Sequence, residues 1–324
     1  MNKNLELYRD ELETQGTNFF ILDTKGKGRV YGDVDFVAYC WDIDHYNQVN
    51  DGDLFIYRRQ QKASEIKGQF YFFGAGKISK IQSIEGKRVK GIISKAFIFD
   101  EPLLQEELED FKWEFRNRGK NWEHFFNQYG MNKITKNDFI HLLSFKPGVL
   151  QESKEISSGM DEEVKFYQRQ EGGNYRVEDQ EGSSKTRGAA QKVFANQVKL
   201  EYGFQCAVTG IKTKELLVAS HIVPWSEDKD NRLNPRNGIC LSPLIDKAFD
   251  KGFISFTDDL KLIVSDSAKT DAALYESLRP YEGKRLNVRK EFEPDRDFLT
   301  WHRTHLLLKY NDGVNKILSK GSFD

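Results

Sequence analysis

The chain has 324 residues, and its 49 Lys and Arg against 50 Asp and Glu give a formal net charge of −1. Bulk charge therefore gives no argument for a nucleic-acid partner, and any such site must be a local basic patch. With 38% hydrophobic residues and only 7 prolines, the composition excludes collagen-like and disordered chains. At roughly 100 to 200 residues per domain, the length predicts a globular protein of two domains or one large one.

The sequence contains no stretch that approaches the roughly 18 to 20 apolar residues of a membrane span. Its first residues, MNKNLELYRDELETQG, lack the apolar centre of a signal peptide. We therefore expect a cytoplasmic protein without a membrane partner. The three cysteines form no C-x-x-C pair, which favours buried thiols over disulfides or a cysteine-rich zinc site.

Residues 18–100 alternate apolar segments such as FFILD, DLFIYRR and QFYFFGAGKISKI with Gly, Asp and Asn. Segments of this kind, bounded by turn residues, predict a β-rich domain. Gly74 and Gly76 interrupt one strand, which indicates a bulge or the close approach of another chain segment. Over residues 101–145 the apolar spacing changes to three and four, which predicts helices. We place the first domain at residues 1–150.

Residues 151–185 are polar and rich in Gly, Ser and Glu, which predicts an exposed linker. The second domain, residues 186–324, opens with a helical segment, GAAQKVFANQVKLEYG. Two short strands, ELLVASHIVPW and NGICLS, then precede a short helix, PLIDKAFDKG. The expected order is strand, loop, strand, helix.

His221 lies at the end of the first of these strands, before a long charged loop, a position where catalytic groups are often found. Asn237 begins the second strand. If the strands pair, we expect the Asn237 side-chain carbonyl to accept an N–H of the imidazole and leave the other ring nitrogen facing a water. A structural histidine is the competing interpretation of His221 taken alone.

Asp246 and Asp250 are four residues apart in the predicted helix and share one of its faces. Two like charges so placed destabilise an isolated helix by roughly 0.2 to 0.5 kcal/mol. A divalent cation would reverse that effect, and carboxylate oxygens suit Mg²⁺ or Mn²⁺. The competing interpretation is that Asp250 caps or packs the turn at DKG.

The segments CAVTG, ASHIVPW, NRLNPRNGICLS and LIDKAFDKGFIS resemble an HNH endonuclease of the ββα-metal fold. The resemblance implies that His221 is the general base, that Asn237 orients it, and that Asp246 is a metal ligand. Ser220 stands directly before the base, where the family often has Asp or His. We expect Ser220, Asp246 and Asp250 to hold one divalent cation per site, Mg²⁺, Mn²⁺ or Co²⁺. The basic residues of the loop are expected to contact DNA phosphates: Arg232 and Arg236.

The runs RVYGDVDFVAYCWDIDHYNQVNDGDLFIYRRQ and GQFYFFGAGKISKI resemble the EVE domain, a PUA-like β-barrel. An EVE-like domain followed by an HNH domain resembles the EVE-HNH modification-dependent restriction endonucleases, which recognise 5-methylcytosine or 5-hydroxymethylcytosine. Recognition of such a base requires a pocket that accepts it after it swings out of the duplex. The candidate pocket residues are Tyr31, Asp33, Tyr39 and Trp41.

Tyr39 and Trp41 are two residues apart on one strand and point to the same side. Asp33 is a candidate acceptor for the exocyclic amine of cytosine. Aromatic residues on strands are more often core than pocket walls, and this is the competing interpretation. Lys77 and Lys80 are candidate phosphate contacts, with a solvated edge strand as the alternative.

The sequence thus predicts an α+β protein, with an EVE-like PUA-like β-barrel joined by a linker to an HNH ββα-metal domain. The predicted function is hydrolysis of phosphodiester bonds in double-stranded DNA that carries modified cytosine. A homodimer is expected because one HNH site cuts one strand. The alternatives are an unconditional nicking or toxin-like HNH nuclease, and a noncatalytic nucleic-acid-binding module with a degenerate HNH, which Ser220 keeps open.

Overall fold

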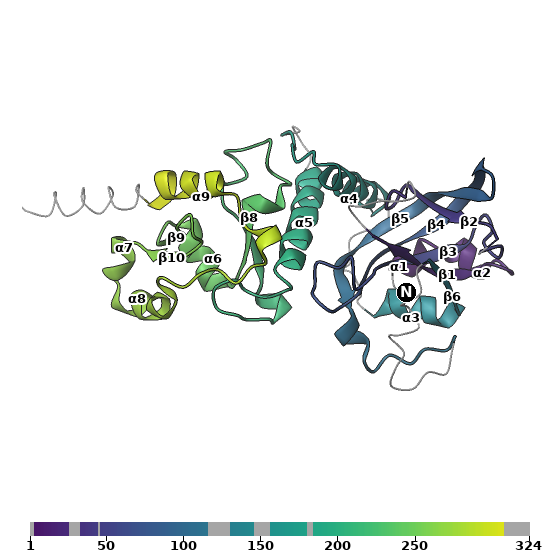
Figure 1. Cartoon of the computed structure of the whole chain (residues 1–324), viewed down its shortest axis with the longest axis horizontal. Coiled ribbons are helices and arrows are strands. Elements are labelled where there is room, and N and C mark those ends of the chain that lie inside the picture. Colours follow the sequence, from purple (N-terminus) through teal and green to yellow (C-terminus); the bar gives the residue numbers. More distant parts are fainter. Residues whose placement is uncertain are drawn as a thin grey trace, which may run out of the picture. The chain divides into compact units, whose positions relative to one another are not determined.

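The computed structural model describes residues 3–25, 33–44, 46–115, 130–145, 156–179 and 184–307 (Figure 1). The chain forms two compact units. The N-terminal unit comprises residues 1–172 and 183–189, and the C-terminal unit comprises residues 173–182 and 190–324. Both contain helices and strands, so the fold is the mixed α and β type that the sequence predicts.

The N-terminal unit is built on one six-stranded sheet with the strand order β2-β5-β4-β3-β1-β6. Strands β1 and β3 are parallel, and the other neighbours are antiparallel. The strands are β1 (Phe19–Thr24), β2 (Ala38–Asp42), β3 (Leu54–Arg59), β4 (Tyr71–Glu85), β5 (Arg88–Leu104) and β6 (Met131–Ile134).

Over the described residues this sheet is open, with β2 and β6 as its edges. The barrel that we expected is therefore not shown, because a barrel closes only when its edge strands pair. The long β4–β5 hairpin changes register at several points, including one between Phe72 and Gly74 and one between Ala75 and Lys77. Such shifts bend a strand pair and increase its twist.

Gly74 of strand β4 lies where another backbone comes close, as the sequence predicted, whereas Gly76 lies against side chains. A Cβ on Gly74 would lie 2.6 Å from the ring of Phe36 and from the Phe97 carbonyl oxygen. A Cβ on Gly76 would lie 2.6 Å from the ring of Phe55. Any side chain at these positions would displace the core.

Short helices pack on the sheet around an aromatic core that includes Tyr8, Phe72 and Phe139. Helix α3 begins with a capping box, in which Thr135 accepts from the Asp138 N–H and Asp138 accepts from the Thr135 N–H. The helical elements before α4 are α1 (Lys3–Glu6), α2 (Arg9–Glu13), the 3₁₀ turn η1 (Gln105–Leu108) and α3 (Lys136–Ser144).

The segment 151–185, expected to be a polar linker, instead contains α4 (Ile156–Glu171) and the first residues of α5 (Ser184–Glu201). Helix α4 contacts β5. The Tyr167 hydroxyl accepts a hydrogen bond from Arg59 Nη2 at 2.9 Å, and Phe166 is buried. The polar composition of this segment predicted a linker. It did not indicate that Phe166 would be buried or that Tyr167 would bond to Arg59 of strand β3.

The C-terminal unit has the predicted order of strand, loop, strand and helix. Strand β7 (Val218–His221) pairs antiparallel with β8 (Gly238–Leu241), and helix α6 (Pro243–Asp250) follows and contacts β7. A second two-stranded sheet and three helices complete the unit: β9 (Ile254–Phe256), β10 (Leu262–Val264), α7 (Asp266–Lys269), α8 (Ala272–Leu278) and α9 (Arg296–His302). The short turns are η3 (Lys214–Leu216), η4 (Pro235–Asn237), η5 (Arg279–Tyr281), η6 (Lys290–Phe292) and η7 (Arg303–Leu307).

Helix α5 lies directly against the β7–β8 pair because Gly238 has no side chain. A Cβ at Gly238 would lie 2.5 Å from Val198 and 2.7 Å from Phe194. The absence of a side chain there brings Phe194 next to the end of β7, where His221 lies. Among the described helices, none has both the length and the apolar character that a membrane span needs.

Candidate active site in the C-terminal unit

His221 is held by one hydrogen bond and two aromatic contacts. Its Nε2 lies 3.0 Å from the Arg232 carbonyl oxygen. The ring stacks on Phe194 at 3.6 Å between centroids and 11° between planes, and Trp225 meets it edge-on at 5.9 Å. Because a carbonyl only accepts, Nε2 carries the hydrogen and Nδ1 carries the lone pair. No described residue forms a hydrogen bond with Nδ1.

The surroundings of His221 keep the imidazole neutral. Burial lowers its pKa from 6.5 to about 4, and the charge of Arg232 acts in the same direction. The bond to the Arg232 carbonyl opposes this shift without reversing it. At pH 7 the ring is therefore neutral, and its open Nδ1 can accept a proton.

Asn237 does not bond to the imidazole, although we expected it to. Its Oδ1 accepts from the Val223 N–H at 2.8 Å, and its Nδ2 donates to the Val223 carbonyl at 3.2 Å. The pairing of His221 with Gly238 places the Asn237 amide beyond the ring, beside the backbone that follows β7. Asn237 therefore fixes the chain after His221, and the Arg232 carbonyl orients the ring.

The two carboxylates of helix α6 influence each other, as their spacing predicts. Burial raises the pKa of the half-buried Asp246. Partial desolvation, and then repulsion by Asp246, raise the pKa of the exposed Asp250. The charges of Lys247 and Lys251 only partly offset these shifts.

Ser220 lies beside Asp246. Its hydroxyl is near enough to Asp246 to lower the pKa of that carboxyl, but Ser220 is only 3% exposed and its Oγ forms no well-aligned hydrogen bond with a described residue. An unsatisfied buried polar group costs about 1 to 3 kcal/mol, so it calls for an explanation. The unpaired hydroxyl and two carboxylates are hard oxygen donors, which fit a divalent cation.

The same geometry limits how such a cation would be held. Within the described ranges, no three His, Cys, Asp or Glu side chains are grouped so that they could bind a metal ion. Asp246, Asp250 and the Ser220 hydroxyl would therefore be the protein ligands, and water or a phosphate oxygen would complete the shell. Small cations such as Mg²⁺ usually keep several waters in this way.

Arg232 is not placed to contact DNA phosphates, contrary to our expectation. It is 2% exposed, and its guanidinium donates to the carbonyl oxygens of Trp225 at 2.8 Å and Val177 at 2.7 Å. The guanidinium also lies 4.7 Å from the Trp225 ring centroid. Arg236 is exposed, so its predicted phosphate contact stays a prediction.

Two of the predicted pocket residues are core residues. Tyr39 and Trp41 are 2% and 7% exposed, and their side chains donate to the Asp23 and Tyr46 carbonyls. Their ring centroids are 6.5 Å apart, which agrees with the expected common side of the strand, but that side faces the interior. Asp33 accepts from the Cys40 N–H at 2.7 Å. Tyr31 lies outside the described residues.

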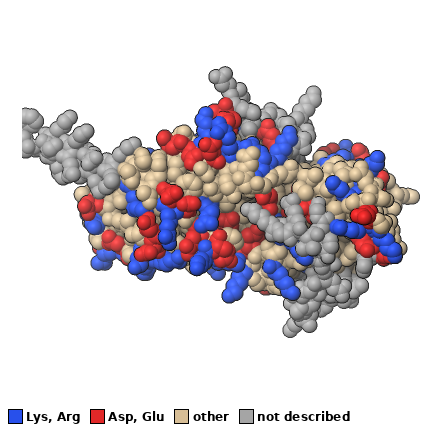
Figure 2. All heavy atoms as spheres, turned by 45° about the horizontal axis from the view of Figure 1, so that its top comes forward, with Lys and Arg blue, Asp and Glu red and all other residues tan. Residues whose placement is uncertain are grey.

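Of the two lysines predicted to contact phosphates, Lys77 has a partner in the protein. Its Nζ lies 2.6 Å from the carboxylate of the buried Glu11, which also pairs with Lys95. Lys80 is exposed on β4 and stays a candidate. On the face shown in Figure 2, basic and acidic side chains are interspersed. This face therefore shows no general basic surface, which agrees with the formal net charge of −1.

Residues 206–257 match the family model described as HNH endonuclease. The match covers the β7–β8 pair, helix α6 and strand β9. It contains His221, Asn237 and both α6 carboxylates, and nucleases of this class generally depend on a divalent cation.

The remaining comparisons are less informative. No curated protein matches the chain. A solved structure titled "Modification dependent TagI restriction endonuclease" is similar at 14% identity and a TM-score of 0.27, covering 88% of this chain and 81% of that chain. Similarity at that TM-score carries no argument about the fold or substrate of this chain.

The sequence did not indicate several residues that shape the site. Phe194 was predicted only as part of an apolar helix face, yet it forms the surface beneath His221. Trp225 contacts both His221 and Arg232. Val177 binds Arg232, and its only sequence signal is an isolated apolar residue in the polar run YRVEDQ.

Proposed function

We propose that this protein is an endonuclease that hydrolyses phosphodiester bonds in double-stranded DNA, with His221 as the general base. The observation that carries the proposal is the state of His221 within an HNH endonuclease domain. The ring is neutral, its Nε2–H is fixed by the Arg232 carbonyl, and its Nδ1 is open. The neighbouring residue, Ser220, lies near the α6 carboxylate of Asp246.

In the proposed reaction, His221 Nδ1 takes a proton from a water whose oxygen bonds to phosphorus. The bond from phosphorus to the 3′ oxygen breaks, and the leaving oxygen takes a proton from solvent, which gives a 5′ phosphate and a 3′ hydroxyl. A divalent cation held by Ser220, Asp246 and Asp250 would neutralise the charge that develops on the phosphate oxygens. Phe194 and the Arg232 carbonyl prevent the ring from turning away.

Supercoiled plasmid DNA tests this proposal. The protein should nick or linearise the plasmid in Mg²⁺, Mn²⁺ or Co²⁺, should stop in excess EDTA, and should recover when the cation is restored. Cleavage that continues in excess EDTA would contradict the role of the cation. Absence of cleavage of every substrate would favour the noncatalytic alternative.

We also propose that the substrate carries 5-methylcytosine or 5-hydroxymethylcytosine, and that the N-terminal unit binds the modified base after it swings out. The resemblance to the EVE domain supports this proposal. Because Tyr39 and Trp41 are buried, other residues must contact the base. A cluster beneath α4 also combines hydrogen-bonding groups with aromatic faces, but it is as buried as Tyr39 and Trp41, so it is closed to a base in this structure.

In this cluster Arg59 and Asp35 are 2% and 3% exposed and form an ion pair at 3.2 Å. The Tyr167 hydroxyl bonds to both, and the Tyr167 ring stacks on Phe73 at 6.3 Å with 21° between planes. The Tyr167 side chain therefore already fills the hydrogen-bonding positions beside Arg59 and Asp35.

Three forms of one plasmid test this second proposal: methylated, hydroxymethylated and unmodified. The intact protein should cut at least one modified form faster than the unmodified form. Equal cleavage of all three would contradict the reader role and leave the nuclease proposal intact, which is the unconditional alternative.

We propose a homodimer as the cutting species, because one HNH site cuts one strand and a double-strand break is most simply made by two sites. Analytical ultracentrifugation with cognate DNA should show two chains per duplex. A single chain per duplex, with nicked circles as the final product, would contradict the dimer and favour a nicking nuclease.

A further inference from the structure

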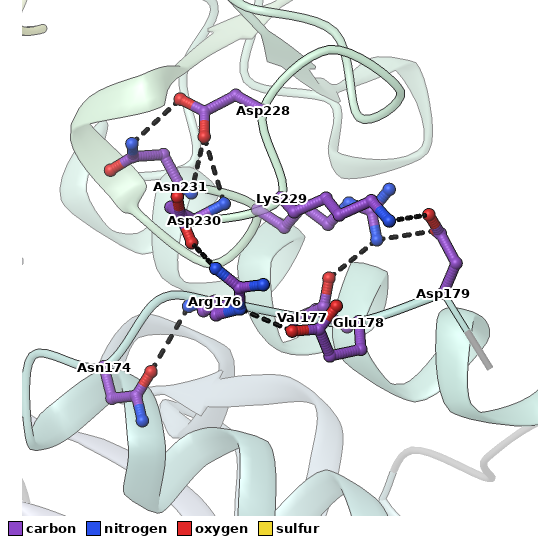
Figure 3. Close-up of polar contacts among 10 residues, drawn as sticks. Asn174, Arg176, Val177, Glu178, Asp179, Asp228, Lys229, Asp230 and Asn231 are labelled. Carbon is purple, nitrogen blue, oxygen red and sulfur yellow. Dashed lines mark hydrogen bonds and ion pairs between the residues drawn. The ribbon is translucent and has the colours of Figure 1, made fainter.

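Residues 174–179, here called the strap, lie along the loop that joins β7 to β8 (Figure 3). The Val177 N–H donates to the Lys229 carbonyl at 2.9 Å, and the Leu233 N–H donates to the Tyr175 carbonyl at 3.0 Å. These bonds hold the strap and loop side by side. The strap follows directly after α4, at the point where the chain passes from the N-terminal to the C-terminal unit.

Ion pairs reinforce this attachment. Asp179 lies 2.8 Å from both Lys229 Nζ and Arg232 Nη1. Hydrogen bonds from Lys229 and Arg232 lower the pKa of Asp179 to about 2, so the carboxylate is charged at every pH relevant to activity. Arg176 also pairs with Asp230 at 2.5 Å, but both of these side chains are largely exposed.

Arg232 connects the strap to His221, because its side chain binds the strap and its backbone carbonyl binds the imidazole. Its side chain is buried and donates to the Val177 carbonyl of the strap. Its own carbonyl accepts the Nε2–H of His221. The guanidinium that binds the strap and the carbonyl that selects the tautomer of the base therefore belong to one residue.

We propose that the strap is a positioning element for His221, acting through Arg232. This inference rests on the proposed nuclease function and deepens it. With Arg232 held by Val177 and Asp179, the carbonyl keeps the hydrogen on Nε2 and the lone pair on Nδ1. A displacement of about 1 Å in a positioned group can reduce a rate about 10²-fold.

The first test compares Arg232→Lys with Arg279→Lys. Lysine at position 232 keeps the charge but cannot donate to both the Trp225 and Val177 carbonyls in the fixed planar geometry of arginine. Arg279 is an exposed arginine of the same unit that pairs with Glu276, so the same substitution there controls for the chemical change.

Two readouts separate positioning from a general structural role. The single-turnover cleavage rate of Arg232→Lys should fall at least about 10-fold with nearly unchanged DNA affinity, whereas Arg279→Lys should match the wild type. NMR of ¹⁵N-labelled histidine should show one Nε2–H tautomer for His221 in the wild type and a mixture in Arg232→Lys. The NMR readout does not need cleavage, so it distinguishes failure of this inference from failure of the nuclease proposal.

Asp179→Ala provides the test if Arg232→Lys does not fold. The Asp179 side chain is 59% exposed, so its removal leaves no buried cavity. We expect a smaller loss of rate, about 3-fold or more, with the same mixed tautomer signal. A folded Arg232→Lys or Asp179→Ala protein with the wild-type rate and a single Nε2–H tautomer would overturn the inference.

Discussion

The ring of His221 stacks on Phe194 with the same geometry that His302 adopts on Phe249. The centroid distances are 3.6 and 3.7 Å, and the planes lie within 11° and 2° of parallel. The two histidines differ in their hydrogen bonds. Both nitrogens of His302 are occupied, by Ser255 Oγ and the Phe249 carbonyl, whereas Nδ1 of His221 is open. One is therefore a structural histidine, and the other is available for proton transfer.

Replacement of Phe194 should change the titration of the base. Phe194→Leu keeps an apolar side chain but removes the flat face beneath His221, so the ring becomes better hydrated and its pKa rises from about 4 toward 6.5. The acid limb of the pH-rate profile should shift to higher pH by a measurable amount. Phe194→Ala is a poorer test, because the loss of a buried Phe costs about 3 to 5 kcal/mol of stability. An unchanged profile in a folded Phe194→Leu protein would mean that the stack does not set the pKa.

The wild-type rate should persist below the ordinary pKa of histidine. Because the pKa of His221 is lowered to about 4, the base form dominates at pH 5, and activity falls only as the pH approaches 4. Burial also raises the pKa values of Asp246 and Asp250, so these carboxyl groups protonate at a higher pH than free aspartates do. Measurement of kcat/KM from pH 4 to 8 at a fixed cation concentration checks this. A midpoint at or above 6.5 would contradict the neutral buried state of His221.

The stability of the C-terminal unit should decrease in acid. Burial lowers the pKa of His302 from 6.5 to about 4. The unfolded chain binds a proton below about pH 6.5 and the folded chain does not, so stability is full above 6.5 and falls toward pH 4. At 1.36 kcal/mol per pKa unit, His302 accounts for at most about 3 kcal/mol. Urea unfolding at pH 7.5 and 5 should show a smaller loss for His302→Gln than for the wild type. An equal loss would assign the acid sensitivity to other groups.

Asp246→Asn should affect stability and activity in opposite directions. Removal of one of two neighbouring charges relieves a repulsion of roughly 0.2 to 0.5 kcal/mol, so the melting temperature should stay the same or rise slightly. Cleavage should fall by at least about 10-fold and need more Mg²⁺, because a charged ligand is lost. A Mg²⁺ titration and a thermal melt measure both effects. Normal cleavage at low Mg²⁺ would remove Asp246 from the cation site.

The parts of the site that lie close together in sequence could be predicted. Ser220, His221 and the two α6 carboxylates fall within a short stretch, and helical spacing alone places Asp246 and Asp250 on one face. The burial of Arg232 could not be predicted, because its partner Val177 is 55 residues away along the chain. An arginine in a charged loop has the same local sequence whether it faces solvent or a distant carbonyl.

The fold of the N-terminal unit could also be predicted only in part from the sequence. The alternation that predicts strands does not determine which face is buried, so Tyr39 and Trp41 could be assigned to a common side but not to the core. The apolar spacing over residues 101–145 predicted helices, yet β5 extends through Leu104. Pairing of Leu103 and Leu104 with Phe72 and Tyr71 decides this, and such long-range contacts override local periodicity.

The central claim is that His221 activates the attacking water, and single-turnover cleavage by His221→Ala tests it most directly. A general base contributes roughly 10² to 10⁴ to the rate, so the variant should lose at least about 10²-fold while its DNA affinity stays within about twofold. His302→Gln serves as the matched control, because it alters a histidine with the same aromatic stack but no open nitrogen. That control should cleave at close to the wild-type rate at pH 7.5. A folded His221→Ala protein that cleaves DNA as fast as the wild type would contradict the assignment.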